Sequence, residues 1–308
     1  MQLRAIDFYK KYVINHKGLP DSVFNGRQSF CYKRGIIVNN TVTIFDSTLR
    51  DGAQAEGVSF SVEDKIKIVR ALDELGIGYI EAGNPGSNPK DLEFFERIKD
   101  IKLNNTTIAA FGSTRRRGIS PSEDGNIQAL LSADTSAVAI FGKSWDFHVT
   151  DIINTTLQEN LEMIYDTIAY LKDKGKYVVF DAEHFFDGYK ENHEYALKTL
   201  DAAAQAGADC LCLCDTNGGT FPQEIYDITK TVAEKYECSP DNLAYIGDDI
   251  NDLPCIEYCG VTACPLDGHE LIKQSVSDIC NNSGGSGAVR EFIDHIEERY
   301  EASSNTIR

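Results

Sequence analysis

The sequence predicts an α/β protein of the (β/α)8 TIM-type barrel class, built around a parallel sheet. From Thr41 onward, short apolar runs alternate with stretches of helical periodicity. The apolar runs do not alternate polar with apolar residues, which is typical of parallel strands covered on both faces. Polar and glycine-rich residues follow each run, as in barrels that carry their chemistry on the loops after the strands. A doubly wound open sheet is the competing layout.

Six strands are expected in the central part of the chain. They are TVTIFD, YIEAG, TTIAAFG, AVAIFG, YVVFDAEH and DCLCLCDT. Helical stretches such as SVEDKIKIVRALDELG and HEYALKTLDAAAQAG separate them. Several of these helices are expected to end at a glycine, namely at Gly76, Gly175 and Gly207, because a left-handed residue commonly follows a helix.

The two ends of the chain differ from this central pattern. Residues 1–40 predict an irregular N-terminal extension, and the central pattern defines a barrel region over residues 41–235. A β/α segment continues over residues 236–300, with the weaker strands LAYIG, VTAC and SDICNN and the short helix NDLPCIEYCG. Residues 301–308 are expected to form a frayed tail.

Composition excludes several classes of function. The net charge of −18 argues against a nucleic-acid partner and against binding to an anionic membrane, since both need clustered Lys and Arg. No apolar run approaches the roughly 20 residues of a spanning helix, and no signal-peptide pattern is present, so we expect a soluble cytoplasmic protein. The nine cysteines are expected as free thiols. Cys210, Cys212 and Cys214 share one strand face, where core packing is expected and a thiolate metal site is the alternative.

Arg50 and Asp51 follow the first apolar strand directly. An arginine offers a rigid fork of donors suited to a carboxylate or a developing enolate oxygen. An aspartate is a hard oxygen ligand for a divalent cation. Taken alone, the pair is most simply an ion pair at a strand end, so its interpretation depends on the motifs that accompany it.

Those motifs occur together and in order. DSTLRDGAQ, DAEHFFDG and CDTNGG, with AFGSTRR and FGKSWDFHV between them, resemble the barrel family of 2-isopropylmalate, homocitrate and citramalate synthases and hydroxymethylglutaryl-CoA lyases. The match is closest to the citramalate synthase-like branch and covers about residues 41–230. The resemblance implies an acyltransferase of the Claisen-condensing type, acting on acetyl-CoA and a small 2-oxo acid such as pyruvate to give citramalate.

The resemblance also implies roles for individual residues. Arg50, Glu183 and Thr216 match catalytic positions, and Asp51 matches a ligand of a divalent metal, Mg²⁺ or Mn²⁺. Gln54, Asp181 and His184 are the neighbouring candidates for substrate binding. The basic cluster STRRRG adds Arg115, as a candidate contact for a carboxylate or for the phosphates of CoA. A homo-oligomer is the expected assembly.

The chain departs from this family near its end. The family completes its metal site with His-x-His on the seventh strand, and no two of the six histidines here are one residue apart. Over about residues 236–296 the chain instead resembles haloacid dehalogenase-like phosphatases, closest to 3-deoxy-manno-octulosonate 8-phosphate phosphatase. In GDDIND, Asp248 and Asp252 would be magnesium-binding acids, with Asp249 beside them.

Three hypotheses therefore stay open. In the first, LAYIG and VTAC occupy the seventh and eighth strand positions, so that a Rossmann-like phosphatase fragment completes the barrel. Asp248 and Asp249 would then share a metal with Asp51 in an impaired or re-equipped condensing enzyme. The second is a magnesium-dependent phosphatase acting on a sugar-acid phosphate, against which stands the lack of a nucleophile motif. The third is a catalytically inactive fusion protein.

Overall fold

The chain divides into two compact units. A computed structural model describes residues 11–15, 45–236, 244–289, 291, 292 and 295. Within these, residues 11–15 and 45–218 form the barrel unit, and residues from 219 onward form the C-terminal unit. The predicted irregular extension lies outside the described residues except for 11–15, and the predicted tail at 301–308 lies outside them altogether.

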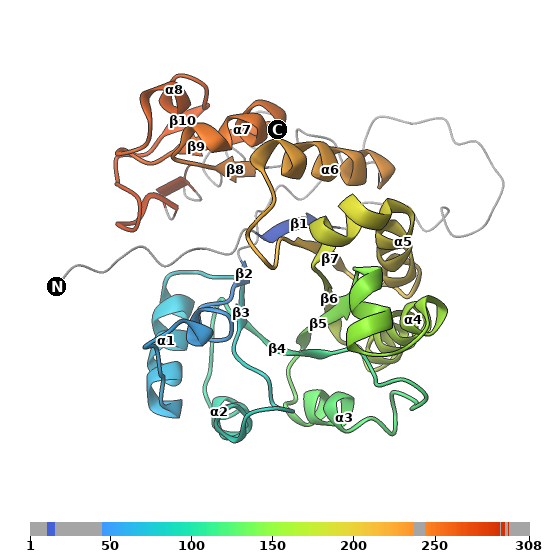
Figure 1. Ribbon diagram of the computed structural model, residues 1–308. Coiled ribbons are helices and arrows are strands. Elements are labelled where there is room, and N and C mark those ends of the chain that lie inside the picture. Colours follow the sequence, from blue (N-terminus) through green and yellow to red (C-terminus); the bar gives the residue numbers. More distant parts are fainter. Residues whose placement is uncertain (1–10, 16–44, 237–243, 290, 293–294, 296–308) are drawn as a thin grey trace, which may run out of the picture. The chain divides into compact units, whose positions relative to one another are not determined.

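The barrel unit contains one sheet of seven strands (Figure 1). The strands are β1 (Lys11–Asn15), β2 (Phe45–Asp46), β3 (Tyr79–Glu81), β4 (Thr107–Ser113), β5 (Ala137–Lys143), β6 (Tyr177–Glu183) and β7 (Cys210–Cys214). Their order is β1-β7-β6-β5-β4-β3-β2, with β2 to β7 parallel and β1 antiparallel to β7. The six predicted strands are thus found as half of a barrel-type sheet, and residues 41–44 of the first of them lie outside the described residues.

Helices connect the parallel strands and lie outside their curved row (Figure 1). They are α1 (Val62–Glu74), α2 (Pro89–Ile98), α3 (Gly125–Ser132), α4 (Leu157–Asp173) and α5 (Phe185–Gln205), with a 3-10 turn η2 (Gly52–Gln54) and a π turn η3 (His148–Ile152). Ser61 begins α1 with a reciprocal capping box to Asp64. The expected glycine caps are confirmed, since φ is 87° at Gly76, 74° at Gly175 and 90° at Gly207.

The C-terminal unit has its own sheet and its own core. Its elements are α6 (Pro222–Lys235), β8 (Ala244–Ile246), η5 (Ile250–Asp252), α7 (Leu253–Tyr258), β9 (Val261–Cys264), α8 (Glu270–Lys273) and β10 (Asp278–Ile279). The three strands are parallel, in the order β10-β9-β8. Small apolar side chains such as Ala263, Cys264 and Cys280 fill the core on this sheet, together with Ile272 and Phe292.

The hypothesis that LAYIG and VTAC complete the barrel sheet is wrong. In the described residues, these segments are β8 and β9, which pair with each other and with β10, and not with the seven-stranded sheet. The free edge of β7 is occupied instead by β1, whose Lys11 and Asn15 lie opposite Cys214 and Cys210. The local pairing has a simple cause, because strands joined by one short helical crossover tend to be neighbours in a sheet.

Candidate active site

The carboxyl ends of β2 to β7 face one edge of the sheet, because these strands are parallel. Arg50 follows β2, and Glu81 ends β3. Lys143 and Glu183 end β5 and β6, where they lie opposite each other in register, and Thr216 follows β7. Most of the catalytic candidates therefore lie along the edge where a barrel of this type carries its chemistry.

Arg50 is held from two sides at this edge. Its Nε donates to Oε2 of Glu81 at 2.6 Å, and its Nη1 donates to Oδ1 of Asp51 at 2.7 Å. The guanidinium carbon also lies 4.0 Å from the centre of the Phe111 ring. Burial alone would lower the pKa of Arg50, but the charges of Glu81 and then Asp51 raise it, so the guanidinium is firmly charged.

Sequence reasoning missed Glu81 as a site residue. Its side chain is fully buried, at 0% exposure. The sequence did contain an indication, because YIEAG places an acid inside an otherwise apolar strand. A buried carboxylate requires a charged or hydrogen-bonding partner, and Arg50 supplies it.

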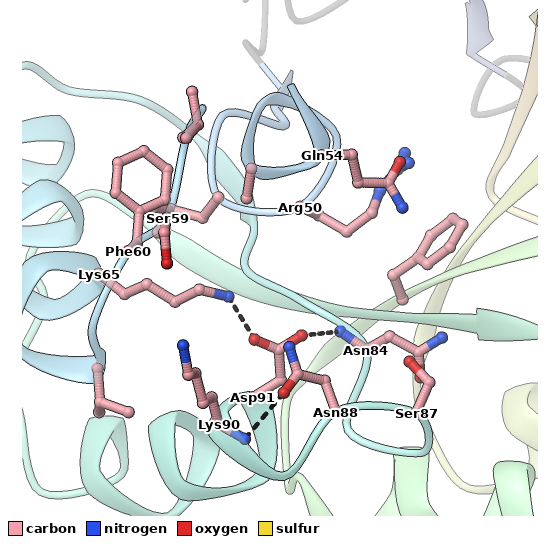
Figure 2. A pocket seen from close by; sticks show the side chains of 15 residues that line it. Arg50, Gln54, Ser59, Phe60, Lys65, Asn84, Ser87, Asn88, Lys90 and Asp91 are labelled. Carbon is pink, nitrogen blue, oxygen red and sulfur yellow. Dashed lines mark hydrogen bonds and ion pairs between the residues drawn. The ribbon is translucent and has the colours of Figure 1, made fainter. Parts of the chain in front are cut away.

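A pocket opens beside Arg50, with a cavity volume of about 250 Å³. Figure 2 shows Arg50 and Gln54 on the loop after β2, and Asn84 and Lys90 from the segment after β3. A buried ion pair forms its base, since Lys65 Nζ donates to Asp91 Oδ1 at 2.5 Å and to the carbonyl of Ala82 at 2.8 Å. Gln54 thus lines the same pocket as Arg50. The charges of Lys65 and Asp91 at the base of this pocket neutralise each other.

Asp51 does not have a complete set of metal ligands around it in the described residues. Among the residues that the structure describes, the one group of three donor side chains close enough to hold an ion is Asp181, Cys212 and Cys214, whose donor atoms lie within 4.8 Å of one another. Mg²⁺ and Mn²⁺ prefer oxygen ligands, which Cys212 and Cys214 do not offer. The described residues therefore do not fit a complete magnesium or manganese site.

Glu183 and Thr216 each contact a neighbouring strand end. Lys143 Nζ donates to Oε2 of Glu183 at 2.5 Å, so the carboxylate is paired across β5 and β6. Thr216 Oγ1 accepts a hydrogen bond from the backbone N–H of His184 at 2.9 Å. Asp181 lies two residues before Glu183 on β6. It pairs in register with Cys212 of β7, and its side chain is almost fully buried. The structure thus brings Glu183, His184 and Thr216 together.

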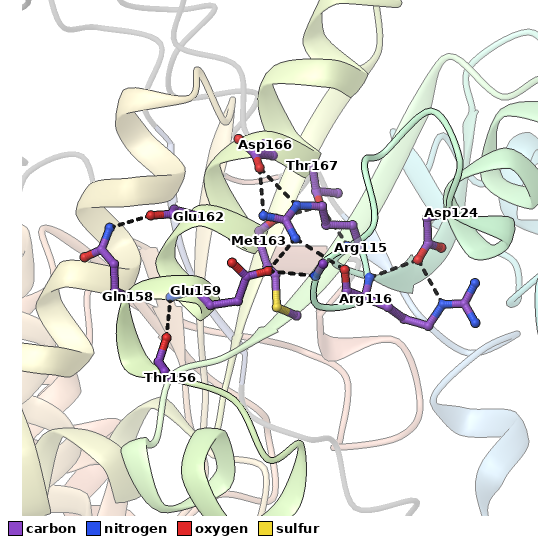
Figure 3. Close-up of polar contacts among 11 residues, drawn as sticks. Arg115, Arg116, Asp124, Thr156, Gln158, Glu159, Glu162, Met163, Asp166 and Thr167 are labelled. Carbon is purple, nitrogen blue, oxygen red and sulfur yellow. Dashed lines mark hydrogen bonds and ion pairs between the residues drawn. The ribbon is translucent and has the colours of Figure 1, made fainter.

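Arg115 lies away from this group and is engaged by its own protein. Figure 3 shows its guanidinium between two acids of α4, with Glu159 at 2.7 Å and Asp166 at 2.8 Å. The backbone N–H of Arg115 also donates to Thr167 Oγ1 at 2.8 Å. Arg115 borders a second cavity of about 450 Å³, which Lys143 also lines. Its side chain connects the loop after β4 to α4. Its guanidinium is already paired with Glu159 and Asp166, so it is poorly suited to bind a charged ligand.

The acids of GDDIND belong to the C-terminal unit. Asp252 is 5% exposed, and its carboxylate accepts from Tyr245 Oη at 2.6 Å and from the backbone N–H groups of Asp248 and Asp249 at 2.9 and 3.1 Å. Asp249 itself accepts from the backbone of Ile250 at 2.7 Å. Asp248 is exposed. Asp252 therefore stabilises its own loop, in an arrangement the sequence reasoning did not anticipate.

Two expectations from composition can be compared with the described residues. All seven cysteines described there carry free thiols, and Cys212 and Cys214 pack in a core cluster with Ala139 and Val179. Among the helices that the structure describes, none combines the length and apolar character needed to cross a bilayer.

The family model and the individual relatives that match this chain by sequence point to one family of proteins. The HMGL-like family model matches residues 41–245. The chain is 59% identical over 196 residues to an (R)-citramalate synthase of Aquifex aeolicus, covering 64% of this chain and 37% of that protein. A homocitrate synthase AksA of Methanopyrus kandleri is 31% identical over 267 residues, covering 84% of this chain and 60% of that protein. The chain spans little more than a third of the length of the citramalate synthases it matches.

Solved structures support the barrel fold and not the phosphatase resemblance. An HMG-CoA lyase of Bacillus subtilis superposes with a TM-score of 0.53 at 21% identity, covering 67% of each chain. These comparisons give no support to the phosphatase resemblance over about residues 236–296. From the family match over residues 41–245, the barrel-type sheet and the site at its carboxyl edge, we conclude that this chain belongs to the HMGL-like family.

Proposed function

We propose that this chain catalyses a Claisen condensation between acetyl-CoA and a small 2-oxo acid, with pyruvate as acceptor and citramalate as product. The observation that carries the proposal is the Arg50–Glu81–Asp51 arrangement at the carboxyl end of β2. It lies within residues 41–245, which the HMGL-like family model matches, and the chain is 47–59% identical over 189–196 residues to five (R)-citramalate synthases.

Arg50 is suited to bind an oxygen that carries negative charge. Nε is engaged by Glu81 and Nη1 by Asp51, which fixes the plane of the guanidinium. Its Nη2 donates to none of the described residues, so it is available to the carboxylate or carbonyl oxygen of a 2-oxo acid. A donor that is already oriented stabilises developing charge without a cost of reorganisation.

Glu183 and Thr216 complete the proposed catalytic group. The ion pair with Lys143 keeps the Glu183 carboxylate at the sheet edge. Thr216 keeps its own O–H as a donor while its oxygen accepts from the His184 backbone. Gln54 and Asp181 remain proposed substrate contacts, and Asp51 a proposed metal ligand. Mg²⁺ or Mn²⁺ dependence, the homo-oligomer and Arg115 as a substrate contact are predictions from sequence.

The test is a thiol-release assay. Acetyl-CoA is supplied with a panel of 2-oxo acids of increasing size, with and without Mn²⁺, and the product is identified by chiral chromatography. We expect release of CoA that depends on pyruvate, with citramalate as product. Arg50→Gln should lower kcat/KM by about 10²–10³-fold, the usual loss of one oriented donor to a charged oxygen. No release with any acceptor would contradict the proposal.

The alternatives are separated by the same preparation. A magnesium phosphatase would release phosphate from sugar-acid phosphates and lose activity in Asp252→Asn. This function is not favoured, because the Asp252 carboxylate is occupied by three donors of its own loop. A folded chain with no turnover in either assay would be the inactive fusion protein.

A further inference from the structure

The second cavity, of about 450 Å³, opens between the loop after β4 and the segment after β5. Four basic residues line it, and none of the described residues that line it is Asp or Glu. The four are Arg115, Arg116, Arg117 and Lys143. Because the chain as a whole has a net charge of −18, a cavity bordered by cations alone reverses the character of the molecule locally.

These four cations differ in how they are engaged. Arg115 and Lys143 are already paired with acids behind the cavity. Arg116 donates its Nε to Oδ2 of Asp124 at 3.1 Å, while its side chain stays 62% exposed. Arg117 is also exposed, and within the described part of the chain no acid pairs with it. Its charge is therefore the one most available to a ligand.

Arg117 presents the edge of its guanidinium that suits an oxyanion. Nη1 donates to the backbone carbonyl of Asn154, which also lines the cavity. Nε and Nη2 donate to none of the residues that the structure describes, and their N–H groups lie side by side. Such an edge binds two oxygens of one anion at once. Figure 3 shows Arg116 held by Asp124 at Nε, with both terminal nitrogens outside that contact.

The loop that carries both arginines is fixed by the protein itself. Glu159 accepts from Nη1 of Arg115 at 2.7 Å and from the backbone N–H of Gly118 at 3.0 Å, which ties the loop to α4 at two points. Across the cavity, Asn154 has φ 51°, in the left-handed region that few non-glycine residues adopt, and its carbonyl orients Arg117. Donors that are fixed in advance lose less entropy when a ligand binds.

The cavity suits a phosphate group better than a carboxylate. Two arginines border it with unengaged N–H groups, and a phosphate group offers three acceptor oxygens and a charge of about −1.5 to −2 to share between them. Its volume is that of a small-molecule site. Phe141, Ile153 and Met163 supply apolar surface for the rest of such a molecule.

We propose that this cavity is a binding site for a small molecule that carries a phosphate group, with Arg117 as its main charged contact and Arg116 as the second. Two sources supply this chemistry, namely the 3′-phosphate of CoA and a separate phosphorylated molecule. The proposal goes beyond the proposed function, because binding here needs no turnover.

Met163 provides a direct reporter for the test. The chain has two methionines, Met1 and Met163, and Met163 lines the cavity. In protein labelled with ¹³C at the methionine methyl groups, Met163→Leu assigns the signal. We expect inorganic phosphate to shift the Met163 signal in a saturable manner. Sodium acetate at the same ionic strength should shift it much less, because a carboxylate has fewer oxygens and less charge.

Arg117→Gln removes the main contact and should weaken phosphate binding by about 10–100-fold, the usual contribution of hydrogen bonds to a charged group. Arg117→Lys keeps the charge but loses the paired N–H groups, so it should restore only part of the affinity. Arg70→Gln is the matched control, since it removes the same charge from an exposed position of α1 that does not line the cavity. We expect this control to bind phosphate as the unchanged chain does.

Titration with CoA and with 3′-dephospho-CoA separates the two sources. If the 3′-phosphate of CoA is the ligand, CoA should shift the Met163 signal at a lower concentration than dephospho-CoA, and Arg117→Gln should abolish the difference. If the ligand is a separate molecule, inorganic phosphate should bind while CoA and dephospho-CoA behave alike.

Two results would overturn the proposal. One is a Met163 signal that does not respond to phosphate, and the other is an equal response in Arg117→Gln and the unchanged chain. Neither result bears on the proposed condensation, which the release of CoA with pyruvate measures separately.

Discussion

Glu81 accepts the Nε–H of Arg50 at 2.6 Å from a position where the Glu81 side chain has no contact with solvent. The pair joins the end of β3 to the loop after β2. Through this hydrogen bond the buried carboxylate of Glu81 orients the Arg50 guanidinium, which the proposed reaction needs.

Removing Glu81 should destabilise the barrel unit as well as the site. Glu81→Ala leaves the Arg50 charge without its buried partner, and breaking a buried pair from one side typically costs about 3–5 kcal/mol. Urea unfolding followed by tryptophan fluorescence measures it. Glu56→Ala, at an exposed position of the loop after β2, is the control and should stay within about 0.5 kcal/mol. Equal effects in both variants would contradict the role given to Glu81.

Adding a methyl group at Gly188 should disturb the packing of α5 against the segment that follows β5. The new Cβ would collide with the carbonyl oxygen of Ser144 and with Trp145, both backbone contacts that cannot rotate away. We expect Gly188→Ala to cost about 1–3 kcal/mol, as overpacking does. Gly125→Ala is the matched change, since nothing lies within 4 Å of a Cβ there, and it should be neutral or slightly stabilising. Thermal unfolding of the two variants side by side decides the point.

Acid stability should depend on Asp73. Burial by itself would raise the pKa of its carboxyl, but hydrogen bonds from the backbone N–H groups of Asn105, Asn104 and Thr106 outweigh it and lower the pKa. A pKa that is lower in the folded state contributes stability above the unfolded value of about 3.9, and this stability is lost as pH falls through the folded value.

Asp73→Asn should therefore lower the Tm at pH 7, and the difference from the unchanged chain should shrink as the pH falls below about 4. Calorimetry across pH 3 to 7 measures this. Asp100→Asn, at an exposed position, provides the comparison. A difference that stays constant over the whole range would show that the charge of Asp73 is not responsible.

Asp252 should matter for the C-terminal unit. Asp252→Ala removes the buried acceptor of three donors, and a hydrogen bond to a charged group is worth about 1.5–3 kcal/mol. We expect the C-terminal unit to unfold earlier in urea, and Mn²⁺ affinity, measured calorimetrically, to stay the same. Glu257→Ala changes a nearby exposed acid as the control. A loss of Mn²⁺ affinity in Asp252→Ala alone would favour the metal-binding role that the sequence suggests.

Much of the fold could be predicted because its causes are local. Uninterrupted apolar runs gave the positions of β4 to β7, and the glycines after α1, α4 and α5 adopt the left-handed conformation that was expected. The pairing of the last strands could not be predicted in this way. The segment LAYIG has the apolar pattern of a strand whether it pairs with β7 or with β9. Its pairing partner depends on competition between these two strands, which the local sequence does not specify.

Site residues could be predicted where they belong to a sequence motif. They could not be predicted where their role depends on side chains that only the folded chain brings into contact. The strand-end positions of Arg50, Glu183 and Thr216 follow from the order of the strands. The partners of Arg115 do not, because Glu159 and Asp166 approach it only through the packing of α4. Glu81 was overlooked for the same reason, since its meaning depends on an arginine 31 residues away.

The antiparallel pairing of β1 with β7 has a consequence for handling the protein. All five residues of β7 are buried, and their sequence, CLCLC, has no charge and no proline. Without Lys11–Asn15, this strand would present a bare row of backbone donors and acceptors, which is the usual template for self-association into aggregates. A shortened version that starts at residue 41, where the family match begins, would thus leave the backbone edge of β7 unpaired by β1. Residues 11–15 should therefore be kept when the protein is expressed.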